Sequence, residues 1–175
     1  MTPIAQQSQA VSEGTTNVTG LKLLQVTESL IVIEYDLLPD TNPGRNGNMA
    51  YIWQNKQQIP YSQTPENKTS ITGSTQRGTF SFPVDLRQNQ YIVGYAVGPE
   101  LSDASQKYGN VCSTVFIAGV PPDKLSEGVV VQAEEDEFFF SNLTLGVVSG
   151  DVVTFKYAVP TNCQPKKNKD RKSVV

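Results

Sequence analysis

The sequence predicts an all-β protein, and three observations lead to this. Short stretches alternate apolar and polar side chains, which is the period-two pattern of a strand with one buried face. The 175 residues include 13 glycines and 11 prolines, as expected where many turns join short strands. Residues that favour helices are scarce. A chain of this length is also long enough to bury a substantial core.

The clearest strand follows a polar turn at residues 85–90. Its alternating positions are Tyr91, Val93, Tyr95 and Val97 on one side and Ile92, Gly94, Ala96 and Gly98 on the other. We expect one of these faces to lie in a core. In a strand expected at residues 30–37, Ile31, Ile33 and Tyr35 share a face in the same way. Further strands are expected at residues 21–26, 49–55, 69–72, 79–84 and 110–117, with one helical turn near residues 101–107.

Two of these patterns resemble a known fold. Leu86, a short polar turn and then Tyr91 at the start of an alternating strand resemble the E-to-F corner of fibronectin type III and immunoglobulin-like β-sandwiches. The order Leu21-x-Leu23, Val26-Thr27 and Ile31-x-Ile33-x-Tyr35 resembles the A and B strands of fibronectin type III domains. The resemblance covers about residues 20–118. It implies a two-sheet sandwich in which Trp53 fills the space between the sheets.

The chain divides into four expected segments. Residues 1–18 are a polar N-terminal arm, residues 19–120 the β-sandwich, residues 121–162 a C-terminal β extension and residues 163–175 a basic tail. The extension contains Val129–Val131, Phe138–Phe140 and Leu143–Leu145, and then a strand that follows the turn at residues 149–151. These strands are too few for an independent sandwich. We expect them to pack on the sandwich, to extend one of its sheets, or to complete a sheet in another copy.

The absence of histidine excludes many enzyme mechanisms. Ser-His-Asp and Cys-His arrangements, a histidine base and an imidazole metal site are all ruled out. Cys112 and Cys163 lie in no sequence context that would lower a thiol pKa, although they could form a disulfide with each other. No phosphate-binding glycine motif follows a strand. We therefore expect a protein without enzymatic activity and without a cofactor.

Charge and hydropathy bear on the partners. Residues 1–162 carry 9 basic and 16 acidic side chains, a net charge of −7, which argues against nucleic acid as the main partner. The basic tail is interpreted as a solvated end. The sequence has no run of about 18 apolar residues and no signal-peptide pattern. We expect no membrane span, and a chain that is either mature and secreted or intracellular.

The best candidate site is identified from the loop arrangement of the expected fold and not from a sequence motif. In immunoglobulin-like folds the loops at one end of the sandwich present the binding residues. The corresponding loops here are residues 39–48, 73–78 and 99–109. The candidate ligand-binding residues are Asp40, Asn42, Arg45, Asn48, Arg77 and Tyr108. Amide, carboxylate and aromatic groups of this kind suit a glycan or a protein surface, although turns are rich in such residues whatever their function.

Two other functions remain open. The chain could be a structural subunit of a homo-oligomer or filament, assembled by strand addition from the N-terminal arm or the C-terminal strands. Less favoured is a glycosidase that uses carboxylates alone. Glu34 and Asp36 would be its candidates, together with the acidic cluster at residues 134–137. This cluster lacks the spacing of a calcium loop and is interpreted as a solvated turn.

Overall fold

A computed structural model of the chain describes residues 15–119 and 139–158. Its elements are β1 (Thr15–Val26), β2 (Leu30–Leu37), α1 (Pro43–Asn46), β3 (Met49–Gln54), β4 (Asn67–Ser70), β5 (Arg77–Pro83), β6 (Tyr91–Ala96), the 3-10 helix η1 (Ala104–Gln106), β7 (Val111–Ile117), β8 (Phe139–Ser149) and β9 (Val152–Ala158). The two helices have four and three residues. The all-β prediction is confirmed, and so is the helical turn near residues 101–107.

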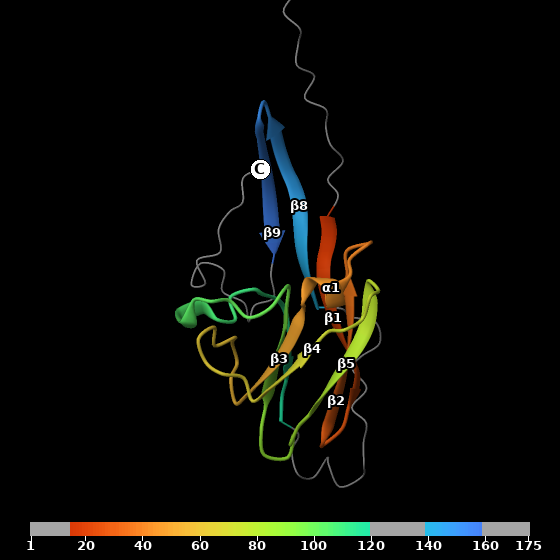
Figure 1. The fold of residues 1–175 in the computed structure, drawn as a ribbon, viewed down its shortest axis with the longest axis vertical. Coiled ribbons are helices and arrows are strands. Elements are labelled where there is room, and N and C mark those ends of the chain that lie inside the picture. The colour runs from red at the N-terminus through yellow and green to blue at the C-terminus, as the bar shows by residue number, and fades with distance from the viewer. Residues whose placement is uncertain (1–14, 120–138, 159–175) are drawn as a thin grey trace, which may run out of the picture.

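The strands form two antiparallel sheets. Sheet A has the order β5-β2-β1-β8-β9, and sheet B has the order β4-β3-β6-β7. The body of the molecule consists of sheet B and the part of sheet A that faces it. Figure 1 shows that β8 and β9 extend past this body at the end where α1 lies.

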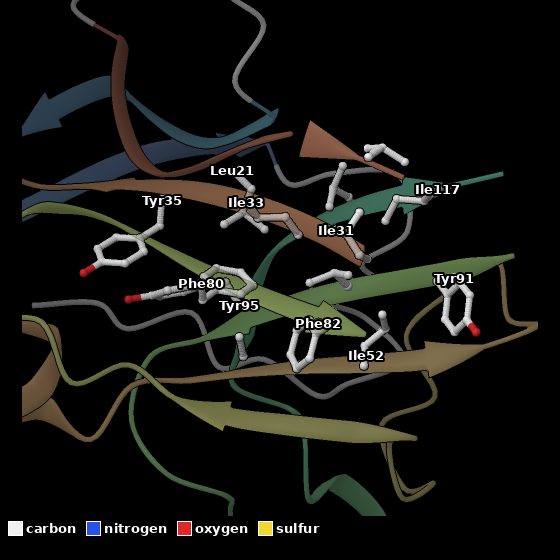
Figure 2. Packing of buried hydrophobic residues seen from close by; sticks show 14 of the residues in the cluster. Leu21, Ile31, Ile33, Tyr35, Ile52, Phe80, Phe82, Tyr91, Tyr95 and Ile117 are labelled. Atoms are coloured by element: carbon white, nitrogen blue, oxygen red, sulfur yellow. The ribbon is translucent and has the colours of Figure 1, made fainter. Parts of the chain in front are cut away.

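The main core lies between the two sheets. Sheet A contributes Leu21, Ile31, Ile33, Tyr35, Phe80 and Phe82, and sheet B contributes Ile52, Val93, Tyr95, Val115 and Ile117. Figure 2 shows Tyr35 and Tyr95 side by side within this core, with ring centroids 5.6 Å apart. The expected shared face of Ile31, Ile33 and Tyr35 is confirmed, because all three side chains are buried here.

A second cluster covers the outer face of sheet B, and it corrects two expectations. Trp53 is buried, but it packs here with Tyr51 and Tyr108 and not between the sheets. The β6 strand is buried at all six positions, whereas one buried face was expected. The physical reason is that Ile59 and Tyr61, from the connection after β3, cover the outer face of the sheet.

Three further findings concern the ends of the strands. The β1 strand begins at Thr15, inside the segment expected to be a polar arm, because Thr15 and Thr16 pair with Thr144 and Leu143 of β8. The β8 strand continues sheet A beside β1, starting with Phe139 opposite Leu21. The turn expected at residues 149–151 joins β8 to β9, and Gly150 there has a φ of 56°. The expected strand at Val129–Val131 lies outside the described residues.

Candidate functional site

Two of the three candidate loops meet backbone to backbone. The Gly44 N–H, in the loop between β2 and β3, donates to the Gly73 carbonyl oxygen at 2.9 Å. A Cβ atom at position 44 would lie 2.7 Å from the Thr72 carbonyl oxygen, which is too close for a side chain. The loop after β2 and the segment between β4 and β5 are therefore held together at one end of the body.

Asn48 joins these loops to the third. Its side chain is 1% exposed. The Asn48 Nδ2 donates to the Tyr95 hydroxyl at 2.9 Å, and the Asn48 Oδ1 accepts from the Gly98 N–H at 2.9 Å. Asn48 thus positions the loop between β6 and β7 from inside the protein. The expected role of Asn48 in ligand binding is not available to a side chain this deeply buried.

The exposed tip of this end is formed by residues 40–47, which we call the α1 tip. The Asn42 Oδ1 caps α1 by accepting from the Arg45 N–H at 2.9 Å, and Gly47 ends α1 with a φ of 69°. Asp40, with a φ of 62°, and Arg45 are both exposed. The α1 tip therefore presents side chains of opposite charge on a backbone that its own caps hold in place.

Arg77 is already engaged within the chain. Its Nη2 lies 2.5 Å from the Asp36 Oδ2, and its Nε lies 3.9 Å from the Glu34 Oε1. The hydrogen bond to Asp36 raises the pKa of Arg77. The structure thus brings the two candidate glycosidase carboxylates to a single arginine, beside β5 on sheet A.

Tyr108 does not offer the exposed ring face that the sequence suggests. Its side chain is 1% exposed, and its ring lies edge-on to Tyr51 and Trp53, with centroids 4.9 and 5.4 Å away. The Tyr108 N–H donates to the Tyr61 carbonyl oxygen at 3.0 Å. Tyr108 therefore anchors the loop between β6 and β7 to the outer face of sheet B.

Asn110 is a loop-positioning residue that the sequence reasoning did not single out. Its Nδ2 lies within hydrogen-bond distance of the carbonyl oxygens of Val97, Gly98 and Pro99, at 3.0, 3.2 and 2.8 Å. A single amide thus ties the end of the loop to its beginning. The only signal in the sequence is the position of an asparagine just before a strand, which is common in turns.

Glu100 fastens the same loop to β4. Its Oε1 lies 2.7 Å from the Lys68 Nζ, and its Oε2 lies 2.9 Å from the Lys107 Nζ. The hydrogen bonds from Lys68 and Lys107 lower the pKa of Glu100. The two ammonium groups are about half exposed, so each pair contributes little in water and less at high salt.

We expect Glu100→Gln to lower the free energy of unfolding at pH 7 by about 0.5 to 1 kcal/mol at low salt. Because the Glu100 pKa is lowered on folding, its stabilising effect is present above the unfolded pKa and is lost as the pH falls through the folded pKa. Urea unfolding of both proteins at pH 7 and pH 3 measures this. A stability difference that stays the same at the two pH values would contradict the assigned pairs.

Cys112 lies between the two sheets, where β7 has an irregularity in its pairing with β6. Its Sγ lies 3.6 Å from the Thr19 Oγ1 and 3.5 Å from the Tyr95 carbonyl oxygen. Burial raises the pKa of this thiol to about 11, so the thiolate is scarce at neutral pH. Cys163, its expected disulfide partner, and the acidic cluster at residues 134–137 both lie outside the described residues.

Two hollows lie on the flanks of the body. One, of about 460 Å³, lies between β4 and β5, and its lining includes Tyr35, Gly73 and Gly78. The other, of about 260 Å³, lies between the connection after β3 and the η1 helix. None of the candidate ligand-binding residues, and neither Glu34 nor Asp36, lines either hollow. In the described part of the chain, no three Asp, Glu, Cys or His side chains gather as metal ligands.

Comparisons with known proteins identify no relative. No protein-family model, no curated protein and no solved structure matches the chain. A search of residues 15–119 and 139–158 found no helix that is long and apolar enough to span a membrane.

Proposed function

We propose that this protein is a non-catalytic recognition or adhesion module, which binds a glycan or a protein surface. The binding site is the end of the body where the loops at residues 39–48, 73–78 and 99–109 lie, which we call the loop end. The observation that carries the proposal is the interlocking of three loops through Asn48 and Gly44. Because these loops are already held in place, little conformational entropy is lost when the α1 tip binds a ligand. Asp40 and Arg45 supply the exposed polar groups there.

The strand order supports an immunoglobulin-like or fibronectin type III-like sandwich. In immunoglobulin-like folds, strands A, B and E share one sheet, and strands C, F and G share the other. Here β1, β2 and β5 share sheet A, and β3, β6 and β7 share sheet B. The β4 strand lies beside β3, whereas strand D of the constant-type domain lies in the sheet of strand E. In such folds, loops at one end of the sandwich carry the binding residues.

A glycan array screened with the full chain tests this proposal. For a glycan that binds, we expect Arg45→Ala to weaken binding by at least about tenfold, because arginines are frequent sources of binding energy at interfaces. The matched control is Arg87→Ala. Arg87 is also exposed, but it pairs with Glu28 at the opposite end of the body, and its removal should leave binding unchanged.

Two results would contradict the proposal. One is equal binding by the wild type and Arg45→Ala. The other is the absence of any ligand, both on the array and in a screen against purified extracellular-matrix proteins. The second result would leave the loop end without a partner.

A second candidate function is supported by the edge strands of sheet A. The chain could be a structural subunit that assembles with copies of itself by strand addition. Within the described residues, sheet A ends in the edge strands β5 and β9, and β8 and β9 extend it past the body (Figure 1). Exposed edges of this kind can pair with strands of another chain.

A further inference from the structure

The four edge strands of the described residues differ in how well they are protected against pairing. The β4 strand has only four residues, and β7 has a register shift in its pairing with β6. The β9 strand has a register shift in its pairing with β8, and its sequence includes Lys156. Short length, bulges and lysines are the features by which natural proteins blunt sheet edges.

The central part of the β5 strand lacks such features, although the strand begins with Arg77 and ends with Pro83. It has seven residues, and all seven pair with β2 without a register shift. Its central positions, 78–82, include no charged residue and no proline. Among the residues that the structure describes, β5 has a strand neighbour only on its β2 side. Alternate backbone N–H and C=O groups of such an edge point away from the sheet and are able to pair with another strand.

The hollow of about 460 Å³ lies directly beside this edge. Its volume is within the range of about 300 to 1,000 Å³ that is typical of ligand pockets. None of its 11 lining residues is an aspartate, glutamate, lysine or arginine. Cβ atoms at positions 73 and 78 would lie 2.6 and 2.3 Å from the Tyr35 hydroxyl oxygen, so glycine at both positions keeps this side of the hollow clear of side chains.

We propose that the β5 edge, with the hollow beside it, accepts residues 4–12 of a second copy of this chain as an added strand. The inference rests on the second candidate function and names its acceptor. Residues 1–12 contain no charged side chain, which suits an uncharged hollow. Residues 4–12 contain no proline and span about 30 Å when extended, against about 23 Å for the seven residues of β5.

The geometry favours a second copy over the same chain as the donor. Thr15 pairs with Thr144 in the projecting part of sheet A, and Thr19 is the first β1 residue that pairs with β2. To lie along its own β5, the arm would have to reverse, return about 13 Å and cross about 10 Å of sheet, which takes roughly seven residues. That return would use residues 8–14, so residues 4–12 could not lie along β5 as one uninterrupted strand.

The test measures the mass of the full chain by light scattering over a range of concentrations. We expect a mass that rises with concentration above the 19.1 kDa of one chain. The double variant Thr79→Lys and Ser81→Lys should raise the concentration needed for assembly by at least about tenfold, because lysines on an edge strand oppose strand addition. The control is Ser62→Lys with Thr64→Lys, two exposed positions in the connection after β3, and it should assemble like the wild type.

A second measurement does not depend on variants. A synthetic peptide of residues 4–12, added in excess to the full chain, should compete with the arms. The mass should fall to that of one chain, while hydrogen exchange stays slow at the β5 amides that point away from β2. The same peptide with proline in place of Gln7 should have no effect on either quantity.

Three results would overturn the inference. Assembly that is unaffected both by the β5 lysines and by the peptide would place the contact on another surface, and the second candidate function would survive. A chain that is monomeric at every concentration, with fast exchange at the β5 amides that point away from β2, would exclude the added strand and this second function together. A monomer in which the β5 amides that point away from β2 exchange slowly would show that the edge is covered within one chain.

Discussion

Replacing Tyr108 with alanine should lower the free energy of unfolding by about 3 to 5 kcal/mol, as expected when a fully buried aromatic side chain is removed. The ring is 1% exposed and packs with Tyr51, Trp53 and the connection after β3, which covers the outer face of sheet B. Part of this cost comes from the cavity that the missing ring would leave beside β3 and the connection after it. Urea unfolding of the full chain measures the effect.

Tyr108→Phe is the matched control, because it keeps the ring and removes only the hydroxyl group. It should cost about 1 kcal/mol or less. A result in which Tyr108→Ala leaves stability unchanged but abolishes ligand binding would contradict the structure. It would mean that Tyr108 presents its ring to a ligand.

Replacing Asn48 with alanine should cost about 2 to 4 kcal/mol, since the buried Tyr95 hydroxyl and the half-buried Gly98 N–H would both lose their partner. Each of them lies 2.9 Å from the Asn48 side chain. The same change releases the loop between β6 and β7 from the loop that carries α1. We therefore expect faster hydrogen exchange at residues 97–101 in addition to the lower stability.

Asn46→Ala provides the comparison for Asn48→Ala. Asn46 is exposed at the end of α1, and its replacement should change stability by no more than about 0.5 kcal/mol. Equal stability losses in the two variants would show that Asn48 is not the residue that holds the loops together.

The sequence was sufficient to predict the strands of the body. The alternation in β2 and β6 predicts their positions, and the face that carries Tyr35, Ile33 and Ile31 is confirmed. The turn at residues 149–151 is also confirmed. It could be predicted because it lies between two apolar stretches. The start of β1 could not be predicted. Thr15 to Asn17 have no apolar alternation of their own, and their pairing depends on a strand more than 120 positions later in the chain.

The two faces of sheet B could not be assigned from the sequence. Four consecutive positions of β3, 50–53, are buried, and a continuous apolar run does not indicate which residues face which core. The expectation that Trp53 lies between the sheets came from the resemblance to immunoglobulin-like folds. The residues that cover the outer face, Ile59 and Tyr61, lie in an irregular connection without periodicity. Only the three-dimensional packing shows that this connection belongs to a core.

The sequence predicted that the three candidate loops lie together, but not which of their residues are buried. The meeting of the three loops follows from the strand order, and the structure brings them together. Asparagine and tyrosine are equally suited to binding a ligand and to holding a loop, so their burial decides between the two roles. Asn48 and Tyr108 are buried, whereas Asp40 and Arg45 remain exposed.

The most direct test of the proposed recognition function is amide chemical-shift mapping of the full chain with its strongest ligand from the glycan array or the matrix-protein screen. We predict that the perturbed amides gather at the α1 tip, residues 40–47, and at residues 97–101, which Asn48 holds beside it. Perturbations confined to the hollow beside β5, to the outer face of sheet A or to the opposite end near Arg87 would contradict the loop end as the binding site.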